Sequence, residues 1–200
     1  MPKAYWVTLY RSISDADKLA AYAKLSGPAV TPLGARYIAR GTAVATFEAG
    51  LKERTVISEF DSVELAKAAH DSAGYQEAMR ALDNGAVRDV RIVEGLEDQG
   101  AGLAGAKAFW VSAYRSISNP DAVAAYGKIA GPAIQGAGGR FLARGEAAAV
   151  FEAGIKQRTV VIAFDSVEAA VACHDGAAYQ EALKVFNNAA ERDFRIVEAL

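Results

Sequence analysis

The sequence has few of the residues from which disulfide frameworks and metal centres are built. Only one cysteine, Cys173, and two histidines occur among the 200 residues. A single cysteine excludes an intrachain disulfide and a cysteine-based metal cluster. The two histidines lie far apart in the chain, and neither has a second histidine at ligand spacing. We therefore predict neither a metal site nor a bound cofactor.

Excess positive charge and long apolar runs are also missing. The net charge is −2, so the chain lacks the basic surface that attracts nucleic acids or anionic membranes. No apolar run reaches the length of about 18 residues that a transmembrane helix needs. The N-terminus, MPKAYWVTLYR, is aromatic and unlike a signal peptide. We expect a cytoplasmic protein without nucleic-acid or membrane partners.

What the sequence does contain is a second copy of itself. When the chain is shifted by 104 residues, 54 of the 93 positions in 4–96 are identical to their counterparts in 108–200. A period of this length corresponds to a whole small domain rather than to a solenoid unit. The intervening stretch, EDQGAGLAGAK, is rich in glycine and alanine and is typical of a linker. We therefore predict one repeat over 1–96, a linker over 97–107 and a second repeat over 108–200.

The residue pattern of one repeat predicts the order β-α-β-β-α-β. Aromatic and β-branched residues predict strands, and residues 43–48 are expected to continue in an extended conformation. The strands are expected over 4–11, 34–41, 54–60 and 88–96. Capping residues predict a helix from Ser14 to Gly27-Pro28, and further helical segments are expected from Asp61 to His70 and over 75–84.

This order is the ferredoxin-like pattern, a four-stranded antiparallel sheet with two helices on one face. The other face would be an exposed apolar surface, which two repeats can bury by packing against each other. The fold class is therefore α+β, with two ferredoxin-like repeats packed sheet to sheet as an intramolecular pseudo-dimeric α/β barrel. Further assembly into a homo-oligomer is compatible with this architecture.

Several phrases together resemble the DUF1330 family, a domain of unknown function. They are AYWV, GxRxxARG, RTVxxxFDSVE, HDxxxYQEA and the closing RIVEGL; the second repeat has the middle three and, for the first and last, AFWV and RIVEAL. The resemblance implies the dimeric α/β-barrel superfamily, in which two ferredoxin-like domains pack sheet to sheet. This chain departs from the usual member by carrying both halves and by having His70 where an aromatic residue is more usual. Because the superfamily supports unrelated chemistries, the resemblance implies a fold and hardly any function.

The phrase GARYIARG at 34–41 and its counterpart GGRFLARG at 138–145 each contain two arginines four residues apart. Side-chain alternation predicts that Arg36 and Arg40 share one face of a strand, about 13 Å apart. Since an arginine is costly beneath a helix, we expect both to point toward the barrel lumen or its rim. They either form internal ion pairs or hold an anionic small molecule, as would Arg140 and Arg144. Candidate ion-pair partners are Glu48, Glu59, Asp89 and Glu94.

His70 and His174 occupy equivalent positions on the inward face of a helix end. Each is either a general acid or base acting near neutral pH, or a helix-end residue satisfied by hydrogen bonds. If they are catalytic, they should line two equivalent pockets, with Tyr75 and Tyr179 within reach. Trp6 and Trp110 either add an aromatic wall to such a pocket or belong to the core.

Two functions follow from these patterns. The first is an enzyme that acts by acid–base chemistry on a small polar or aromatic metabolite in a pocket between helix and sheet. Its catalytic residues would be His70, His174, Tyr75 and Tyr179, and its ligand-binding residues Arg36, Arg40, Arg140, Arg144, Trp6 and Trp110. The alternative is a non-catalytic small-ligand-binding or structural module. Haem handling, which occurs elsewhere in the superfamily, would require an accessible histidine aimed into a large cavity.

Overall fold

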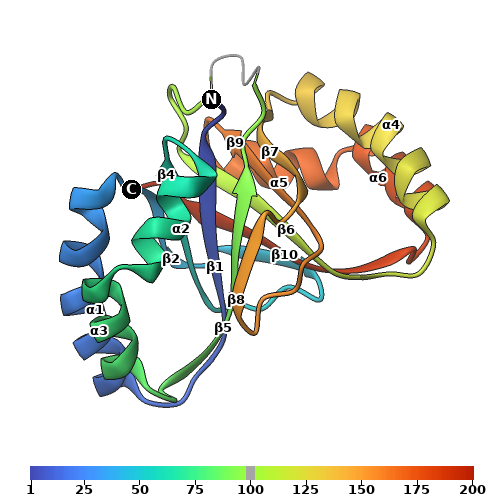
Figure 1. The fold of residues 1–200 in the computed structure, drawn as a ribbon. Helices are drawn as coiled ribbons and strands as arrows, with labels where there is room; N and C mark the ends of the chain where they lie inside the picture. Colours follow the sequence, from blue (N-terminus) through green and yellow to red (C-terminus); the bar gives the residue numbers. More distant parts are fainter. Residues whose placement is uncertain (98–101) are drawn as a thin grey trace.

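In the computed structural model, which describes residues 1–97 and 102–200, both repeats contain the same succession of elements (Figure 1). The first repeat comprises β1 (Ala4–Ile13), α1 (Ala16–Val30), the 3-10 turn η1 (Thr31–Leu33), β2 (Arg36–Thr42), β3 (Ala45–Glu48), β4 (Arg54–Phe60), α2 (Val63–Asp71), α3 (Ala73–Leu82) and β5 (Ala86–Glu94). The second comprises β6 (Ala108–Ile117), α4 (Pro120–Gly136), β7 (Arg140–Glu146), β8 (Ala149–Glu152), β9 (Arg158–Phe164), α5 (Val167–Asp175), α6 (Ala177–Phe186) and β10 (Ala190–Glu198). Residues 98–101 of the predicted linker lie outside the described residues.

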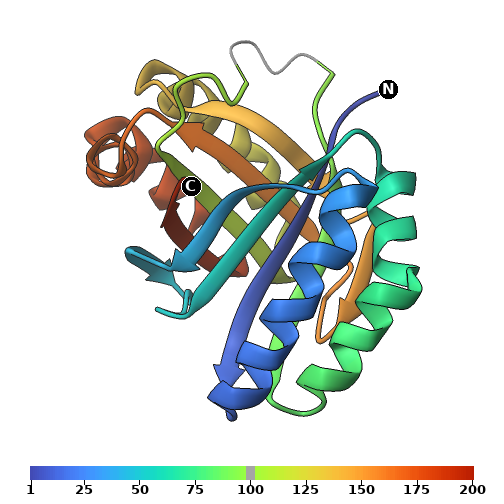
Figure 2. The same ribbon diagram turned by 90° about the vertical axis from the view of Figure 1, so that its left-hand side faces the viewer.

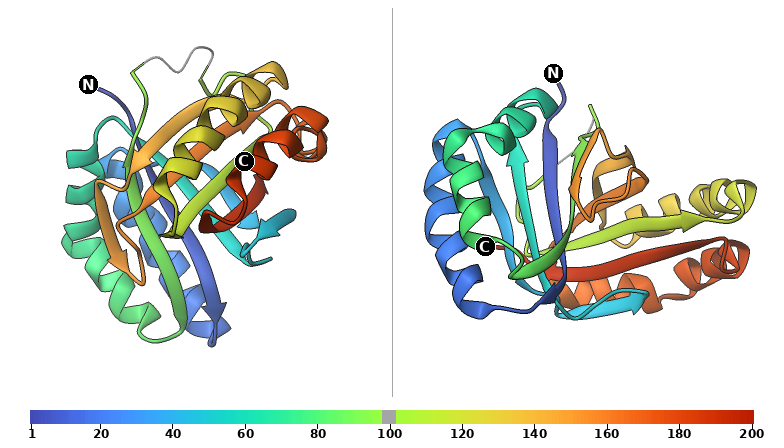
Figure 3. Two further views of the ribbon diagram at one scale, coloured as in Figure 1. Left: turned by 90° about the vertical axis from the view of Figure 1, so that its right-hand side faces the viewer. Right: turned by 60° about the horizontal axis from the view of Figure 1, so that its bottom comes forward.

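Each of the two antiparallel sheets has five strands, one of which comes from the other repeat. The strand orders are β2-β4-β1-β5-β8 and β3-β10-β6-β9-β7. In Figure 1, β8 lies beside β5, and Figure 3 shows β3 in cyan along the red strand β10. The prediction of a four-stranded sheet was therefore incomplete, because the extended segment 43–48 leaves its own repeat. It pairs with an outer strand whose backbone groups would otherwise lack partners.

The inner faces of the two sheets pack against each other, as expected. Side chains from both repeats form one buried apolar cluster there, which includes Val7, Ile57, Val111 and Val161. The helices cover the outer faces, and Figure 2 shows α1 and α3 side by side on the first sheet. The barrel closes where the amide of Leu200 donates to the carbonyl oxygen of Ile38 and that of Leu96 to Leu142. The two repeats thus face each other within one chain, and the predicted pseudo-dimeric barrel is confirmed.

Fully buried charged residues lie where the repeats meet, and of these the sequence analysis had named only Asp89, as a candidate ion-pair partner of other arginines. Arg91 donates two hydrogen bonds of 2.7 Å to Asp89, and Arg195 donates two of 2.7 Å to Asp193. Each guanidinium also reaches the other repeat, where Arg195 donates to the carbonyl oxygen of Tyr10 at 3.0 Å. A buried charge is tolerated only when it is paired and hydrogen-bonded, so these contacts tie the two repeats together.

Helix α1 differs from its prediction at both ends. It begins one residue later, since the N-cap is Asp15, whose carboxylate accepts hydrogen bonds from the amides of Asp17 and Lys18. It continues through Pro28 to Val30, where a break at Gly27-Pro28 was predicted. A proline removes only one backbone hydrogen bond and leaves the helical φ accessible. The longer helix brings an additional turn over the first sheet.

Within the described part of the chain, no helix is long and apolar enough to cross a membrane.

Candidate ligand-binding site

A β-bulge in β2 places the two arginines of the first repeat on opposite faces of the sheet. In the pairing with β4, Tyr37 lies opposite Ser58 and Ala39 opposite Ile57, so Ile38 is the extra residue. Ile38 and Ala39 both join the core between the sheets, whereas Tyr37 and Arg40 both face helix α1. The prediction that Arg36 and Arg40 share a face is therefore wrong, and Arg40 does not point toward the barrel lumen or its rim. The second repeat has the same register shift in β7.

Arg36 and Arg140 take part in internal ion pairs. Arg36 lies 2.6 Å from Glu59, one of the four partners considered from the sequence. Arg140 lies 2.7 Å from Asp165 and also donates to two backbone carbonyls at the end of the linker. These contacts match the ion-pair interpretation for both residues.

Replacing Arg36 with alanine is expected to lower the free energy of unfolding by about 1 kcal/mol or less, because Arg36 is exposed and the buried Glu59 keeps Lys3 at 3.9 Å. The Arg36 side chain is 62% exposed, and Glu59 would keep the hydrogen bond from the Tyr5 hydroxyl at 3.3 Å. Urea denaturation measures the change, with the exposed Arg80→Ala as the matched control. A loss near 3 kcal/mol, the range of a broken buried pair, would contradict this expectation.

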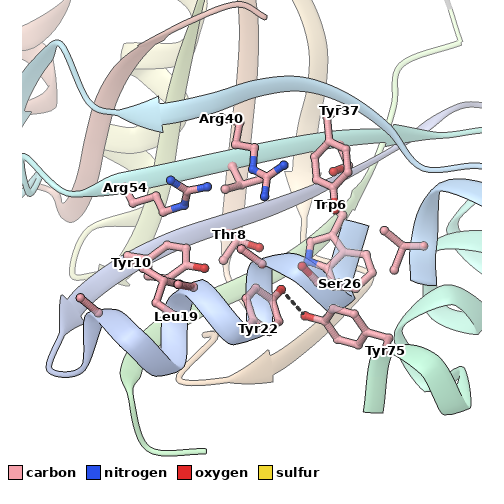
Figure 4. A pocket seen from close by; sticks show the side chains of 16 residues that line it. Trp6, Thr8, Tyr10, Leu19, Tyr22, Ser26, Tyr37, Arg40, Arg54 and Tyr75 are labelled. Carbon is pink, nitrogen blue, oxygen red and sulfur yellow. Dashed lines mark hydrogen bonds between the residues drawn. The ribbon is translucent and has the colours of Figure 1, made fainter. Parts of the chain in front are cut away.

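A cavity of about 240 Å³ lies between helix α1 and the outer face of the first sheet (Figure 4). Strand alternation turns Trp6, Thr8 and Tyr10 of β1 toward it. From α3, Tyr75 reaches the same space, and its hydroxyl lies 3.2 Å from that of Tyr22 on α1. Trp6 and Tyr75, both candidates from the sequence, therefore line one cavity. Their roles in binding or catalysis stay predictions.

Two guanidinium groups face this cavity without a carboxylate partner. Arg40 lies opposite Val56 in the ladder and Thr42 lies opposite Arg54, so the two arginines are diagonal neighbours on one face. Among the residues that the structure describes, neither forms a salt bridge, and the Nε of Arg54 is buried without a hydrogen-bond partner. The guanidinium of Arg40 lies 5.3 Å from the centroid of the Tyr37 ring. The positive charges of these two diagonal neighbours repel each other, and an anion bound between them would relieve the repulsion.

A third arginine, Arg88, packs against tyrosine rings that line the cavity. The guanidinium of Arg88 lies 4.6 Å from the centroid of the Tyr22 ring and is paired with Glu152 of the exchanged strand β8, with Nε at 2.9 Å. Arg192 of the second repeat pairs in the same way with Glu48 of the exchanged strand β3. Sequence reasoning placed Arg88 at a strand start and missed this role. The alternation of β5 is the signal that could have found it, because it places Arg88 on the same face as Val90 and Ile92.

Tyr75, the tyrosine that reaches the cavity from α3, is a phenol rather than a phenolate at neutral pH. Burial, with a smaller contribution from Tyr22, raises the pKa of Tyr75 well above its ordinary value. Burial also raises the pKa of the equivalent Tyr179. These side chains can therefore donate a hydrogen bond, but they cannot act as bases.

The histidines lie elsewhere. His70 stacks on Phe151 of the exchanged strand β8, with ring centroids 3.5 Å apart, and His174 stacks on Phe47 of β3 at 3.4 Å. In each case Nδ1 lies 2.8 Å from the carboxylate of the next residue. Neither histidine lines the cavity beneath α1, its equivalent beneath α4 or the two hollows beside the second repeat. The prediction that they line two equivalent pockets is therefore wrong, because the exchanged phenylalanines cover them.

No group of three metal-binding side chains is found in the described ranges 1–97 and 102–200. The requirement for haem, a histidine aimed into a cavity, is not met at either histidine of the described chain.

The second repeat has a cavity in the equivalent place, beneath α4, of only about 50 Å³. Trp110, Tyr179 and Arg144 line it, as their counterparts line the first cavity. Such a volume holds one or two water molecules at about 30 Å³ each, whereas a cavity of about 150 Å³ accommodates benzene. A wider, more open hollow of about 590 Å³ adjoins it and shares Arg144 and Arg158, so the second repeat differs from the first in having only a small enclosed cavity.

Family comparison agrees with the internal duplication. The model of the DUF1330 domain of unknown function matches residues 3–96 and, a second time, residues 107–200. The chain belongs to the DUF1330 family. The two matches show a DUF1330 tandem duplication within one chain. A search of curated proteins finds no match.

Solved structures of similar fold cover almost the whole chain. An anthrone oxidase-like protein superimposes with a TM-score of 0.62 at 11% identity, covering 100% of this chain and 92% of that one. A chlorite dismutase variant from Candidatus Nitrospira defluvii superimposes with a TM-score of 0.52 at 7% identity, covering 98% and 91%. At such identities the likeness shows the DUF1330 tandem to have the dimeric α/β-barrel fold and carries no chemistry.

Proposed function

We propose that the protein binds a small aromatic carboxylate in the cavity of its first repeat. The observation that carries this proposal is the pair of guanidinium groups, Arg40 and Arg54, which face the cavity without a carboxylate partner in the described chain. The guanidinium group is planar and always charged, and its donors match both oxygens of a carboxylate. A bound carboxylate would supply the counter-charge that the protein itself does not provide.

The remaining walls favour a planar, largely apolar ligand. Trp6, Tyr10, Tyr22, Tyr37 and Tyr75 surround the space with aromatic rings. Ligand sites typically combine such an apolar lining with a few polar groups that fix orientation. The volume of about 240 Å³ exceeds the cavity of about 150 Å³ that holds benzene, so a substituted single ring fits.

Binding is favoured over proton transfer because the cavity lacks a general base. Its lining contains neither a carboxylate nor an imidazole, and burial keeps Tyr75 protonated by raising its pKa. Acid–base catalysis needs a group that can accept a proton near the operating pH. The non-catalytic alternative from the sequence analysis, a small-ligand-binding module, is therefore the function that this geometry supports.

Benzoate is expected to raise the melting temperature of the protein by mass action, and neutral benzamide is expected to raise it much less. Arg40→Ala and Arg54→Ala should each weaken benzoate binding by roughly 10- to 100-fold, since a hydrogen bond to a charged group contributes about 1.5–3 kcal/mol. Isothermal titration calorimetry measures the affinities. The matched controls are Arg144→Ala and Arg158→Ala, the equivalent positions of the second repeat, which should bind benzoate as the wild type does. Equal binding of benzamide, or unchanged affinity in both first-repeat variants, would refute the proposal.

A further inference from the structure

The cavity of the first repeat has two chemically different ends. Along β4, the side chains of Arg54, Val56 and Ser58 face it in succession. The Cα atoms of Arg54 and Ser58 lie about 13 Å apart along the strand, from a rise of about 3.3 Å per residue. The bulge in β2 places Tyr37 opposite Ser58. Figure 4 shows Arg54 at one end of the cavity, and Tyr37 with Ser26 at the other.

The end away from Arg54 carries hydroxyl groups without partners. Ser26 and Ser58 are only 3% and 6% exposed, yet neither hydroxyl forms a hydrogen bond with another residue of the described chain. The Tyr37 hydroxyl, beside them, has no such bond either. Ser26 reaches the cavity from α1, one turn after Tyr22. The three residues line the cavity, so their hydroxyls are available to hydrogen-bond a polar guest at this end.

The second repeat lacks this hydroxyl end. At the positions equivalent to Ser26, Tyr37 and Ser58 it has Ala130, Phe141 and Ile162. All three replacements remove a hydroxyl, and the isoleucine adds apolar volume to the cavity that measures about 50 Å³.

The charged end of the second cavity differs as well. Glu146 lies directly opposite Arg158 in the ladder of β7 and β9, where the first repeat has Thr42 opposite Arg54. Arg144, Glu146 and Arg158 line the same hollow, so the Glu146 carboxylate, which lies 3.8 Å from Lys156, makes this end less positive than its counterpart in the first repeat. An anionic ligand therefore meets less uncompensated charge there.

We propose that the duplicated chain has one working binding site, in the first repeat, and that its ligand is an aromatic carboxylate bearing a hydroxyl or amino substituent at the end opposite the carboxylate. The inference rests on the proposed function of the same cavity. The carboxylate lies between Arg40 and Arg54, and the substituent lies among Ser26, Ser58 and Tyr37. Serine and tyrosine hydroxyls both donate and accept hydrogen bonds, which matches a hydroxyl or an amino group.

Selectivity for the substituent follows from the cost of leaving these hydroxyls unpaired. A site built to hydrogen-bond a ligand group rejects the analogue that lacks the group far more strongly than an apolar pocket rejects a missing methylene. Unsubstituted benzoate would satisfy the arginines and leave the hydroxyl end empty. It should therefore bind more weakly than a hydroxybenzoate of the same charge.

Calorimetric titration with benzoate and with 3- and 4-hydroxybenzoate tests the inference on the intact chain. We expect one molecule per chain and an affinity for at least one hydroxybenzoate about tenfold above that for benzoate, which corresponds to about 1.4 kcal/mol. The double variant Ser26→Ala and Ser58→Ala should lose this preference while it still binds benzoate. The matched control, Ile162→Val in the second cavity, should retain it.

The outcomes separate the two proposals. Two equivalent sites per chain, or a hydroxybenzoate preference absent in the wild type or unchanged in the double variant, overturn the inference while benzoate binding still supports the proposed function. Binding of none of the three acids overturns both. If the double variant does not fold, the stoichiometry and the wild-type preference still decide the question.

Discussion

Replacing Asp193 with alanine is expected to lower the free energy of unfolding by about 3 to 5 kcal/mol, the range for removing one partner of a buried ion pair. Asp193 is fully buried and accepts hydrogen bonds from Arg195 at 2.7 Å and from Arg11 of the other repeat at 2.6 Å. Its loss leaves the Arg195 guanidinium buried without a counter-charge. Because small domains are stable by about 5 to 15 kcal/mol, this single change removes a large share of the stability.

Denaturation with guanidinium chloride measures the change in the free energy of unfolding, with Asp165→Ala as the matched control. Asp165 also pairs with an arginine, Arg140, but its side chain is 72% exposed, so its loss should cost less than about 1 kcal/mol. The combined change Asp193→Leu with Arg195→Met should recover much of the stability, because it leaves no fully buried charge without a partner. Arg11 also loses Asp193, but its side chain is 24% exposed and can be solvated. Similar losses for Asp193→Ala and Asp165→Ala would show that the buried pair does not hold the repeats together.

Cutting the chain at an engineered protease site within residues 98–101 is expected to leave the two halves associated. Each half supplies one strand to the sheet of the other, β3 to β10 and β8 to β5, and the two share one apolar core. Glu48 and Glu152 of the exchanged strands pair with buried arginines of the opposite half. Separation would expose all of these surfaces together, so the cut protein should behave as a single unit.

Size-exclusion chromatography after cleavage should give the elution volume of the intact 21.0 kDa protein. A tag on one half should retain the other half until denaturant is added. The cut protein carrying Phe47→Ala and Phe151→Ala provides the comparison, because it loses the rings that cover His174 and His70. Its halves should dissociate at a lower denaturant concentration. If each half is recovered separately as a stable monomer after cleavage, the shared-sheet architecture is contradicted.

Much of the fold could be predicted because it depends on local patterns. Strand β4 has the bounds expected from its β-branched run, and Ser62 caps α2 as the DSVE signature indicates. The duplication and the need to cover apolar sheet faces then predict the barrel. The longer α1 was missed because Gly27-Pro28 is a strong local break signal that the packing of the helix on the sheet overrides.

The candidate site was predictable only in part. Trp6 and Tyr75 line the cavity together with Arg40. Arg54 was missed, although side-chain alternation along β4 places it on the same face as Val56 and Ser58. The histidines were chosen because of their chemistry, and nothing in their own segment shows that Phe151 and Phe47 cover them. The loss of three hydroxyls between the repeats was visible in the aligned sequences, but its meaning depends on those positions lying at one end of one cavity.

The sequence by itself determined the duplication, the order of elements and the sheet-to-sheet packing, because these follow from periodicity and from the burial of apolar faces. Tertiary structure alone decided which strands exchange, which face each arginine occupies and which cavity stays open. A single bulge at Ile38 reverses the direction of every later side chain in β2, and so moves Arg40 from the barrel core to the cavity beneath α1. Such a shift of one residue has no signature in the local sequence, since it is set by the register with the neighbouring strand.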